Sequence, residues 1–139
     1  MLPMLASGVV LLLLDQWSKM TVQSQVRGRC ISWGPILRIR WVANANRIHA
    51  RRGARAALAL VWFMALLAAI VLHRSGAWFQ NDVALLGLGL ALGGAAGNLL
   101  DILRYRYIVD FIDLRWWPVF NLADVGIVGG LLLALTQRA

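Results

Sequence analysis

The sequence contains no glutamate and a single cysteine, Cys30, among its 139 residues. One cysteine cannot form an internal disulfide bond or a metal site that needs several thiolates. Charged residues make up only 14% of the chain, whereas soluble domains carry about 25%. Much of the surface must therefore face something other than water.

The charges that are present are strongly unbalanced. Fourteen Lys and Arg stand against six Asp, which gives a net charge of +8. In a soluble protein this balance suggests a nucleic acid as the partner, but the sequence has no groove-reading motif. Because 60% of the residues are hydrophobic, we expect membrane lipids with anionic headgroups, and no nucleic acid, to face the basic side chains.

Four apolar stretches predict four transmembrane helices, at about residues 2–22, 56–72, 83–100 and 116–136. A hydrocarbon core of ~30 Å is spanned by about 20 residues of helix, with a range of ~17–25. Each stretch must be helical because lipid offers no partner for backbone N–H and C=O groups. The first stretch lacks the basic start and the cleavage site of a signal peptide. We therefore predict an all-α polytopic membrane protein with one domain, residues 1–139.

The connections between these helices differ in length and charge. The first, at about residues 23–55, is long and basic, and its partly alternating segment 36–42 favours a short β-strand or hairpin. Nine Lys and Arg lie within residues 15–55 and three more within 101–115. Successive crossings place these two connections on the same side of the membrane. The positive-inside rule taken alone would put that side in the cytoplasm.

Glycines spaced four residues apart mark the predicted helix contacts. This spacing lets helix backbones approach each other closely in a membrane. We expect these glycines to pack helices: Gly89, Gly93 and Gly97 in the third apolar stretch, Gly126 and Gly130 in the fourth.

Polar side chains at two helix ends form the most informative pattern. Asn98 and Asp101 end the third apolar stretch. Asn121 and Asp124 begin the fourth. Residues three apart share one helical face, and in an antiparallel helix pair the two faces meet at the same membrane depth. Asp110 lies between them in sequence.

Several carboxylates near the membrane interface suit general acid–base catalysis. Like charges at short range in a low dielectric cannot both ionise cheaply, so two carboxylates share one proton. The ionised member can then take a proton from water and the protonated member can donate one, as in aspartic proteases. The structural alternatives are a solvated helix end for Asp101 and a loop or cap role for Asp110. Asp124, about two turns into an apolar stretch, is the hardest to explain without a function.

These residues resemble the motifs of the signal peptidase II family, the bacterial lipoprotein signal peptidases. Residues 15–19 are similar to the motif that ends the family's first helix, and residues 93–101 to its Gly-Gly-Ala-x-Gly-Asn-x-x-Asp motif. Residues 109–111 and 120–124 resemble the remaining two motifs. The spacing between the motifs also fits, and the resemblance covers most of the chain.

The resemblance implies an intramembrane aspartic endopeptidase that removes signal peptides from prolipoproteins. Cleavage would fall on the N-terminal side of the diacylglyceryl-modified cysteine. By motif position, Asp110 and Asp124 would be the catalytic pair. Supporting or substrate-binding roles are implied for six further residues: Asn98, Asp101, Asn121, Asn44, Asp15 and Lys19. No metal or organic cofactor is implied, and we expect a monomer.

The resemblance also implies an orientation that contradicts the charge count. It places the chain in the bacterial cytoplasmic (inner) membrane, with both termini in the cytoplasm and the active site at the extracytoplasmic face. The long basic connection would then be a small extracytoplasmic element that contains β-structure, similar to the family's β-cradle. We follow this orientation because a lipoprotein peptidase must face its secreted substrate.

Four positions depart from the family pattern. Asn46 and His49 stand where the family's middle motif has glycine and phenylalanine, Ile102 replaces an arginine, and Arg106 replaces a glycine. Two alternatives therefore stay open. The chain could be a divergent homologue that binds lipidated or signal-peptide helices without cleaving them, or a transport or assembly subunit whose aspartates relay protons.

Overall fold

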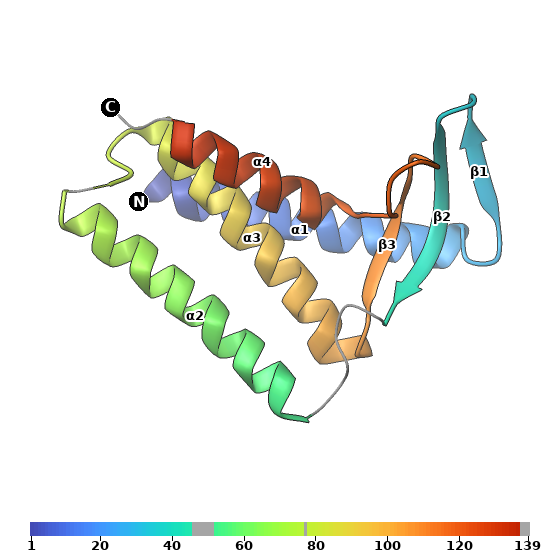
Figure 1. The fold of residues 1–139 in the computed structure, drawn as a ribbon, viewed down its shortest axis with the longest axis horizontal. Helices are drawn as coiled ribbons and strands as arrows, with labels where there is room; N and C mark the ends of the chain where they lie inside the picture. Colours follow the sequence, from blue (N-terminus) through green and yellow to red (C-terminus); the bar gives the residue numbers. More distant parts are fainter. Residues whose placement is uncertain (46–51, 77, 137–139) are drawn as a thin grey trace.

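The computed structural model describes residues 1–45, 52–76 and 78–136, so Asn46 and His49 lie outside the described residues. Within them the chain forms a helical part with a small sheet at one end of it (Figure 1). The helices are α1 (Leu2–Gln25), α2 (Arg52–Arg74), α3 (Asp82–Tyr105) and α4 (Leu122–Thr136). The strands are β1 (Cys30–Trp33), β2 (Leu37–Asn44) and β3 (Ile108–Asp113).

Helix α3 makes the most extensive helix contacts, with α1 and with α4, which also touch each other, and α2 packs against α3. Figure 1 shows the four helices. The close approach depends on glycine. A Cβ atom added to Gly87 of α3 would lie 2.6 Å from the carbonyl oxygen of Gly130 in α4, and one added to Gly93 would collide with the backbone of Gly8 in α1. The glycine spacing therefore marks real helix contacts, as predicted.

Two of the helices are long and apolar enough to cross a membrane, judged over the described residues. They are the segment Gly53–Arg74 of α2 and the whole of α3, Asp82–Tyr105. Helix α4 is apolar but has only 15 residues, and α1 is interrupted by Asp15 and Lys19. The structure thus supports a membrane protein, and the full count of four spans stays a prediction.

The predicted start of the fourth helix was wrong. We expected it at residue 116, but α4 begins at Leu122. Before it, Phe120 forms a backbone bridge with Ile112: the N–H of Phe120 donates to the carbonyl of Ile112 at 3.1 Å, and that of Ile112 donates back at 2.8 Å. This pairing holds the segment extended, and Pro118 also lies within it. The helix can therefore begin only after the bridge.

The other three helices run past their predicted ends, to Gln25 in α1, from Arg52 in α2 and to Tyr105 in α3. The end of α3 explains one departure from the family pattern. Arg106 closes the helix in the left-handed conformation, with φ 65°. Glycine is favoured at this position because it has no Cβ to clash. Arg106 therefore adopts a backbone conformation that favours glycine, the residue that the family has at this position.

The sheet confirms the predicted hairpin and adds a strand. Its order is β1-β2-β3, with both pairings antiparallel. Strand β3 is not predicted, because the sequence pattern indicates only a polar connection between helices at residues 101–115. It is nearly all buried, and Phe111 packs with Val22 and Val26 at the end of α1. The sheet therefore lies where α1 and α3 end and α4 begins (Figure 1).

Candidate active site

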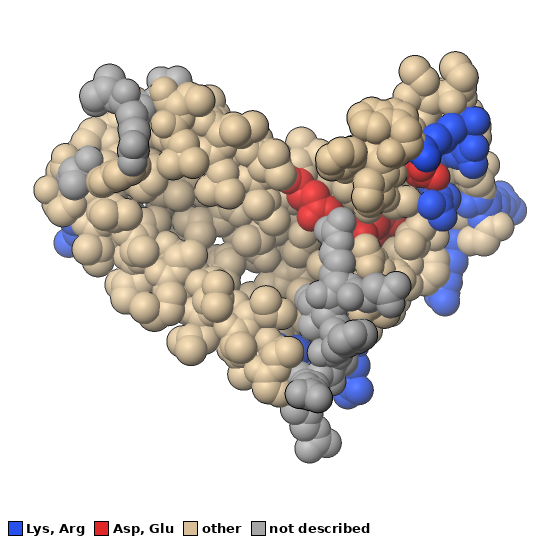
Figure 2. Space-filling view, viewed as in Figure 1, with Lys and Arg blue, Asp and Glu red and all other residues tan. Residues whose placement is uncertain are grey.

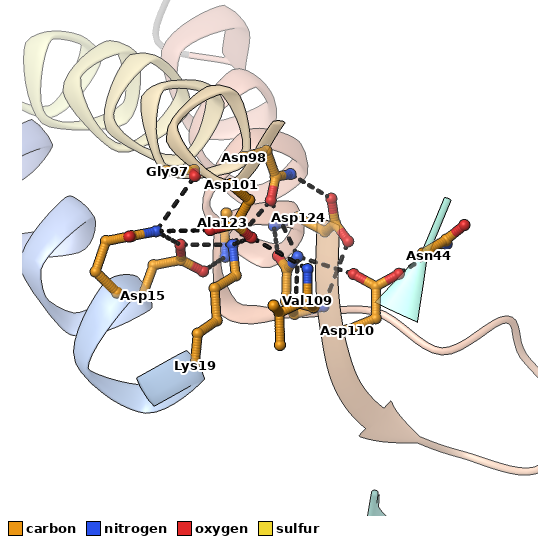
Figure 3. A network of polar contacts seen from close by, with 12 residues as sticks. Asp15, Lys19, Asn44, Gly97, Asn98, Asp101, Val109, Asp110, Ala123 and Asp124 are labelled. Atoms are coloured by element: carbon orange, nitrogen blue, oxygen red, sulfur yellow. Dashed lines mark hydrogen bonds and ion pairs between the residues drawn. The ribbon is translucent and has the colours of Figure 1, made fainter. Parts of the chain in front are cut away.

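Asp110 and Asp124 meet at Asn121. The side-chain amide of Asn121 donates to Oδ1 of Asp110 at 2.9 Å. The backbone N–H of Asn121 donates to Oδ2 of Asp124 at 3.3 Å. Figure 3 shows the two carboxylates turned toward each other, one from β3 and one from α4. One residue thus brings together two aspartates that lie 14 positions apart in sequence.

Asp124 is placed by the start of its helix. Its own backbone N–H donates to Oδ1 of Asn121 at 2.9 Å, while its carboxylate accepts the N–H of Asn121. This reciprocal pair is a capping box, which satisfies backbone donors that the first helical turn leaves unpaired. Asp124 therefore lies in the first turn of α4, not two turns into it as we predicted. The positive end of the helix dipole favours its negative charge.

Asp110 is placed by the sheet. Its residue is fully buried, and its position in β3 is paired with Val42 in β2. Alternate residues of a strand point to the same face, so Asn44 lies next to Asp110 on that face. The amide of Asn44 donates to Oδ2 of Asp110 at 2.8 Å. The structure therefore brings the predicted supporting residue Asn44 into contact with the pair.

Lys19 organises a buried cluster behind the two aspartates. Its Nζ atom lies 2.7 Å from Oδ2 of Asp15 and 2.8 Å from Oδ2 of Asp101. The third contact is a hydrogen bond of 3.0 Å to Oδ1 of Asn98. An ammonium group has three donors, and all three are used. The alternative of a solvated Asp101 is wrong, because this residue is only 1% exposed.

The buried cluster also holds the backbone of both elements that carry the pair. Oδ1 of Asp15 accepts the N–H of Ala123, next to Asp124, at 2.9 Å. Oδ2 of Asp101 accepts the N–H of Val109, next to Asp110, at 3.1 Å. Two of the predicted supporting residues, Asp15 and Asp101, thus fix the positions of α4 and β3, as Figure 3 shows.

Asn98 joins the cluster to the aspartate pair. Its Oδ1 accepts from Lys19 and from the side-chain amide of Asn121, both at 3.0 Å. Its own amide donates to Oδ1 of Asp124 at 2.9 Å. All eight predicted site residues therefore belong to one connected network.

Gln16 belongs to the same network and was not singled out from the sequence as a site residue. Its amide lies 3.2 Å from the carbonyl of Gly97 and 3.1 Å from Oδ1 of Asp101. The feature of the sequence that could have identified Gln16 is its position inside the motif at residues 15–19. At the family's arginine position Ile102 is buried, whereas Arg104 is exposed and reaches Oε1 of Gln16 only at 3.5 Å.

A groove opens beside Asp124 along α4. It has a volume of about 490 Å³, and its walls are Trp117, Phe120, Asp124, Val125, Val128 and Gly129. Asp124 brings the one carboxylate to this otherwise apolar wall. Acidic side chains are visible at the surface between the helical part and the sheet in Figure 2. An apolar groove with one convergent polar group is a suitable binding site for an apolar substrate.

A site for a metal ion is not formed by the residues that the structure describes. Among residues 1–45, 52–76 and 78–136, no three His, Cys, Asp or Glu side chains gather closely enough to hold one. The acidic groups are instead matched to Lys19 and to asparagine amides. The arrangement brings the carboxylates of Asp110 and Asp124 to one asparagine, Asn121.

The comparisons with known proteins point to one family. A family model described as signal peptidase (SPase) II matches residues 8–138. A lipoprotein signal peptidase from Moorella thermoacetica is 51% identical over 52% of this chain and 49% of its own length. One from Nitratidesulfovibrio vulgaris is 32% identical over 94% of this chain and 85% of its own. Over the first relatives, the chain spans about half of their length or less.

Solved structures agree on the fold. A structure described as a bacterial membrane enzyme has a TM-score of 0.79 and is 24% identical, with 98% of this chain and 94% of that chain covered. A second one of the same description has a TM-score of 0.80. The fold, the aspartate motifs and the family match agree with one another, and the chain belongs to the signal peptidase II family.

Proposed function

We propose that this protein is an aspartic endopeptidase that cleaves lipid-modified prolipoproteins on the N-terminal side of the lipidated cysteine. The observation that carries the proposal is the shared contact of Asp110 and Asp124 with Asn121. Support also comes from the groove that opens at Asp124. The family match supports the class of substrate.

In the proposed mechanism a water molecule lies between the two carboxylates. One ionised carboxylate takes a proton from this water as it attacks the scissile carbonyl. The other carboxylate starts protonated, donates a hydrogen bond to the carbonyl oxygen and later supplies the proton that the leaving amine needs. Asn98 and Asn44 would hold the carboxylates in place, since each amide donates to one of them.

We further propose that all four helices cross the membrane. Buried charge argues for this in α1, because Asp15 and Lys19 neutralise each other inside the protein and do not face lipid. Helix α2 exposes large apolar side chains such as Leu60 and Phe63, which suits contact with acyl chains. Helix α4 rises about 22 Å at 1.5 Å per residue, and the extended segment before it would complete the crossing.

The proposed location is the bacterial inner membrane, with the sheet and the aspartate pair at the extracytoplasmic face. Both termini would then lie in the cytoplasm, and the protein would act as a monomer. Its substrate would approach within the membrane, so that binding to the apolar groove orients the scissile bond and lowers the entropic cost of the reaction.

The experiment that tests this proposal compares two substrates. The purified protein is mixed with a prolipoprotein that carries diacylglycerol on its cysteine, and separately with the same protein without the lipid. We expect cleavage of the lipidated substrate only, with a product that begins at the modified cysteine. Cleavage at another site, or of both substrates equally, would contradict the proposal. Binding of the lipidated substrate without cleavage would favour the non-catalytic alternative.

A further inference from the structure

The β1–β2 hairpin has two chemically different faces. Residues paired across an antiparallel ladder point to the same face. The pairs Ile31–Ile39 and Trp33–Leu37 form an apolar face. The pairs Cys30–Arg40 and Ser32–Arg38 form a polar, basic face.

Part of the apolar face is exposed. Ile39 packs against the core at the end of α1, beside Val22. Farther along the hairpin, Ile31 is 43% exposed, Trp33 is 66% exposed and Ile36 in the turn is 60% exposed. Contiguous exposed apolar side chains rimmed by polar residues mark interaction surfaces. We call Ile31, Trp33 and Ile36 the hairpin tip.

Basic groups flank the hairpin tip. Figure 2 shows Lys and Arg side chains gathered at the sheet end of the molecule. Arg40 is matched to Asp113, with Nε 2.6 Å from the carboxylate. Arg38 is half-buried and lies opposite Asp113 in the β2–β3 ladder, and its buried Nε has no hydrogen-bond partner within the described ranges. Arg29 is exposed just before β1. Arg29 therefore suits a ligand with negative charge, and Arg38 adds positive charge to the polar face of the hairpin.

The position of the hairpin relative to the helix ends indicates the chemistry of that ligand. Helix α1 ends at Gln25 and β1 begins at Cys30, while β3 begins at Ile108, just after α3 ends. If these helices cross the membrane, as the proposed function has it, the sheet lies at the membrane surface. Tryptophan and arginine together are typical of that layer, where the ring meets the interface and the guanidinium meets phosphate.

We propose that the β1–β2 hairpin docks on anionic phospholipid headgroups, and this proposal rests on the membrane crossing proposed above. The hairpin tip enters the boundary between headgroups and acyl chains, Arg29 binds lipid phosphates, and the positive charge of Arg38 adds to their attraction. The chemistry required of the partner is an apolar layer directly below a negatively charged one. A membrane leaflet with anionic lipid supplies both, whereas the exposed end of a soluble peptide supplies only one.

The single cysteine makes this testable in the intact protein. Cys30 is exposed on β1, so it is labelled with a nitroxide, and the protein is placed in lipid discs. One set of discs is phosphatidylcholine alone and the other contains added phosphatidylglycerol. The collision rates of the label with oxygen and with a water-soluble nickel complex report how deeply the hairpin lies. We expect deeper immersion in the anionic discs, and high salt should reduce the difference.

Three variants sharpen the test. Each arginine near an anionic surface favours docking about fivefold, so R29Q/R38Q should remove the difference between the two kinds of disc. R29K/R38K keeps the charge and should retain most of the difference in immersion between the two kinds of disc. R74Q changes one exposed arginine at the far end of α2 and should retain the whole difference in immersion. A parent protein with equal immersion in both discs, or a difference that survives in R29Q/R38Q, would overturn the proposal.

Failure of this proposal is distinguishable from failure of the proposed function. The immersion measurement does not depend on cleavage, so an inactive protein that docks in anionic discs supports docking and contradicts only the peptidase. The variant W33S separates a substrate role. If W33S raises the KM for the prolipoprotein and leaves immersion unchanged, the hairpin binds substrate and not lipid, and the proposal is overturned.

Discussion

The side-chain amide of Asn98 donates a hydrogen bond of 2.9 Å to Oδ1 of Asp124, and Lys19 fixes its direction from the other side. Lysine can only donate, so the oxygen of Asn98 must face Lys19 and its NH2 must face Asp124. Asn121 is fixed in the same way, because its oxygen accepts the backbone N–H of Asp124 and its NH2 faces Asp110. Donors of fixed orientation stabilise negative charge where the proposed reaction needs it.

Replacing Lys19 tests the cluster that holds this arrangement. In Lys19→Met, the carboxylates of Asp15 and Asp101 would be buried without a cation. We expect a loss of about 3–5 kcal/mol in the free energy of unfolding, because breaking a buried ion pair leaves uncompensated charge. Thermal unfolding in detergent measures it. The double variant Lys19→Met/Asp15→Asn removes one of the stranded charges and should recover part of the loss. A change within the experimental error for Lys19→Met would contradict the role.

Gly94 tests the contact between α3 and α4. A Cβ atom at this position would lie 2.5 Å from the carbonyl oxygen of Ala123. Gly94 lies one helical turn before Asn98, whose amide donates to Asp124. We expect Gly94→Ala to cost about 1–3 kcal/mol of stability through overpacking. Moving Asn98 away from Asp124 by even 1 Å should also lower the cleavage rate by about 10²-fold.

Gly129 is the matched control for Gly94. A Cβ atom at Gly129 meets nothing within 4 Å, so Gly129→Ala should leave stability unchanged or raise it by up to about 1 kcal/mol through helix propensity. Equal destabilisation by both substitutions would show that the helix contact does not cause the effect.

Arg106 tests the cost of a departure from the family pattern. Its φ of 65° lies in the left-handed region, which costs a residue with a Cβ roughly 1–2 kcal/mol. Arg106→Gly should therefore raise the midpoint of thermal unfolding, with a gain of up to about 1 kcal/mol. Arg104→Gly, two residues earlier in the last turn of α3, should lower the midpoint because glycine weakens a helix. The same sign for both variants would refute this explanation.

Asp113 should make the stability of the sheet depend on pH in the acid range. The backbone N–H of Arg115 at 2.8 Å and then the side chain of Arg40 lower the pKa of this carboxyl below its ordinary value of 3.8. The stabilisation is complete above the unfolded pKa and is lost as the pH falls through the lower folded value. The protection factors of the sheet amides, which compare their exchange rates with those of an unfolded chain at the same pH, should therefore fall below a pH of about 4. In Asp113→Asn this acid step should be absent, and an unchanged step would contradict the assignment.

The structure brings the expected site residues together, whereas it changes the bounds of the elements that carry them. All eight expected residues share one network because each motif contains a polar side chain whose burial requires a partner. The strand β3 could not be predicted, since Ile108–Asp113 is short and carries two aspartates, which are disfavoured in strands. Its burial depends on contacts with α1 and β2 that are distant in sequence.

The start of α4 was missed for a related reason. The apolar run begins at Trp116 and gave no sign of where the helix starts, because hydropathy does not report backbone pairing. The bridge between Phe120 and Ile112 decides the boundary, and it forms only once β3 exists. The Asn-x-x-Asp spacing correctly indicated that the two side chains at the start of α4 act together. In the structure, however, Asn121 and Asp124 cap the start of the helix and do not lie within it as a pair on one face.

The most direct measurement compares Asp110→Asn, Asp124→Asn and the double variant in cleavage of a lipid-modified prolipoprotein. If both carboxylates act on one water molecule, each single variant should lower kcat by about 10²–10⁴-fold. The double variant should then be hardly slower than either one, because groups that work as a unit lose their effect together. Correct folding is checked by unchanged thermal unfolding. Retention of near-parental cleavage by either single variant would contradict the account.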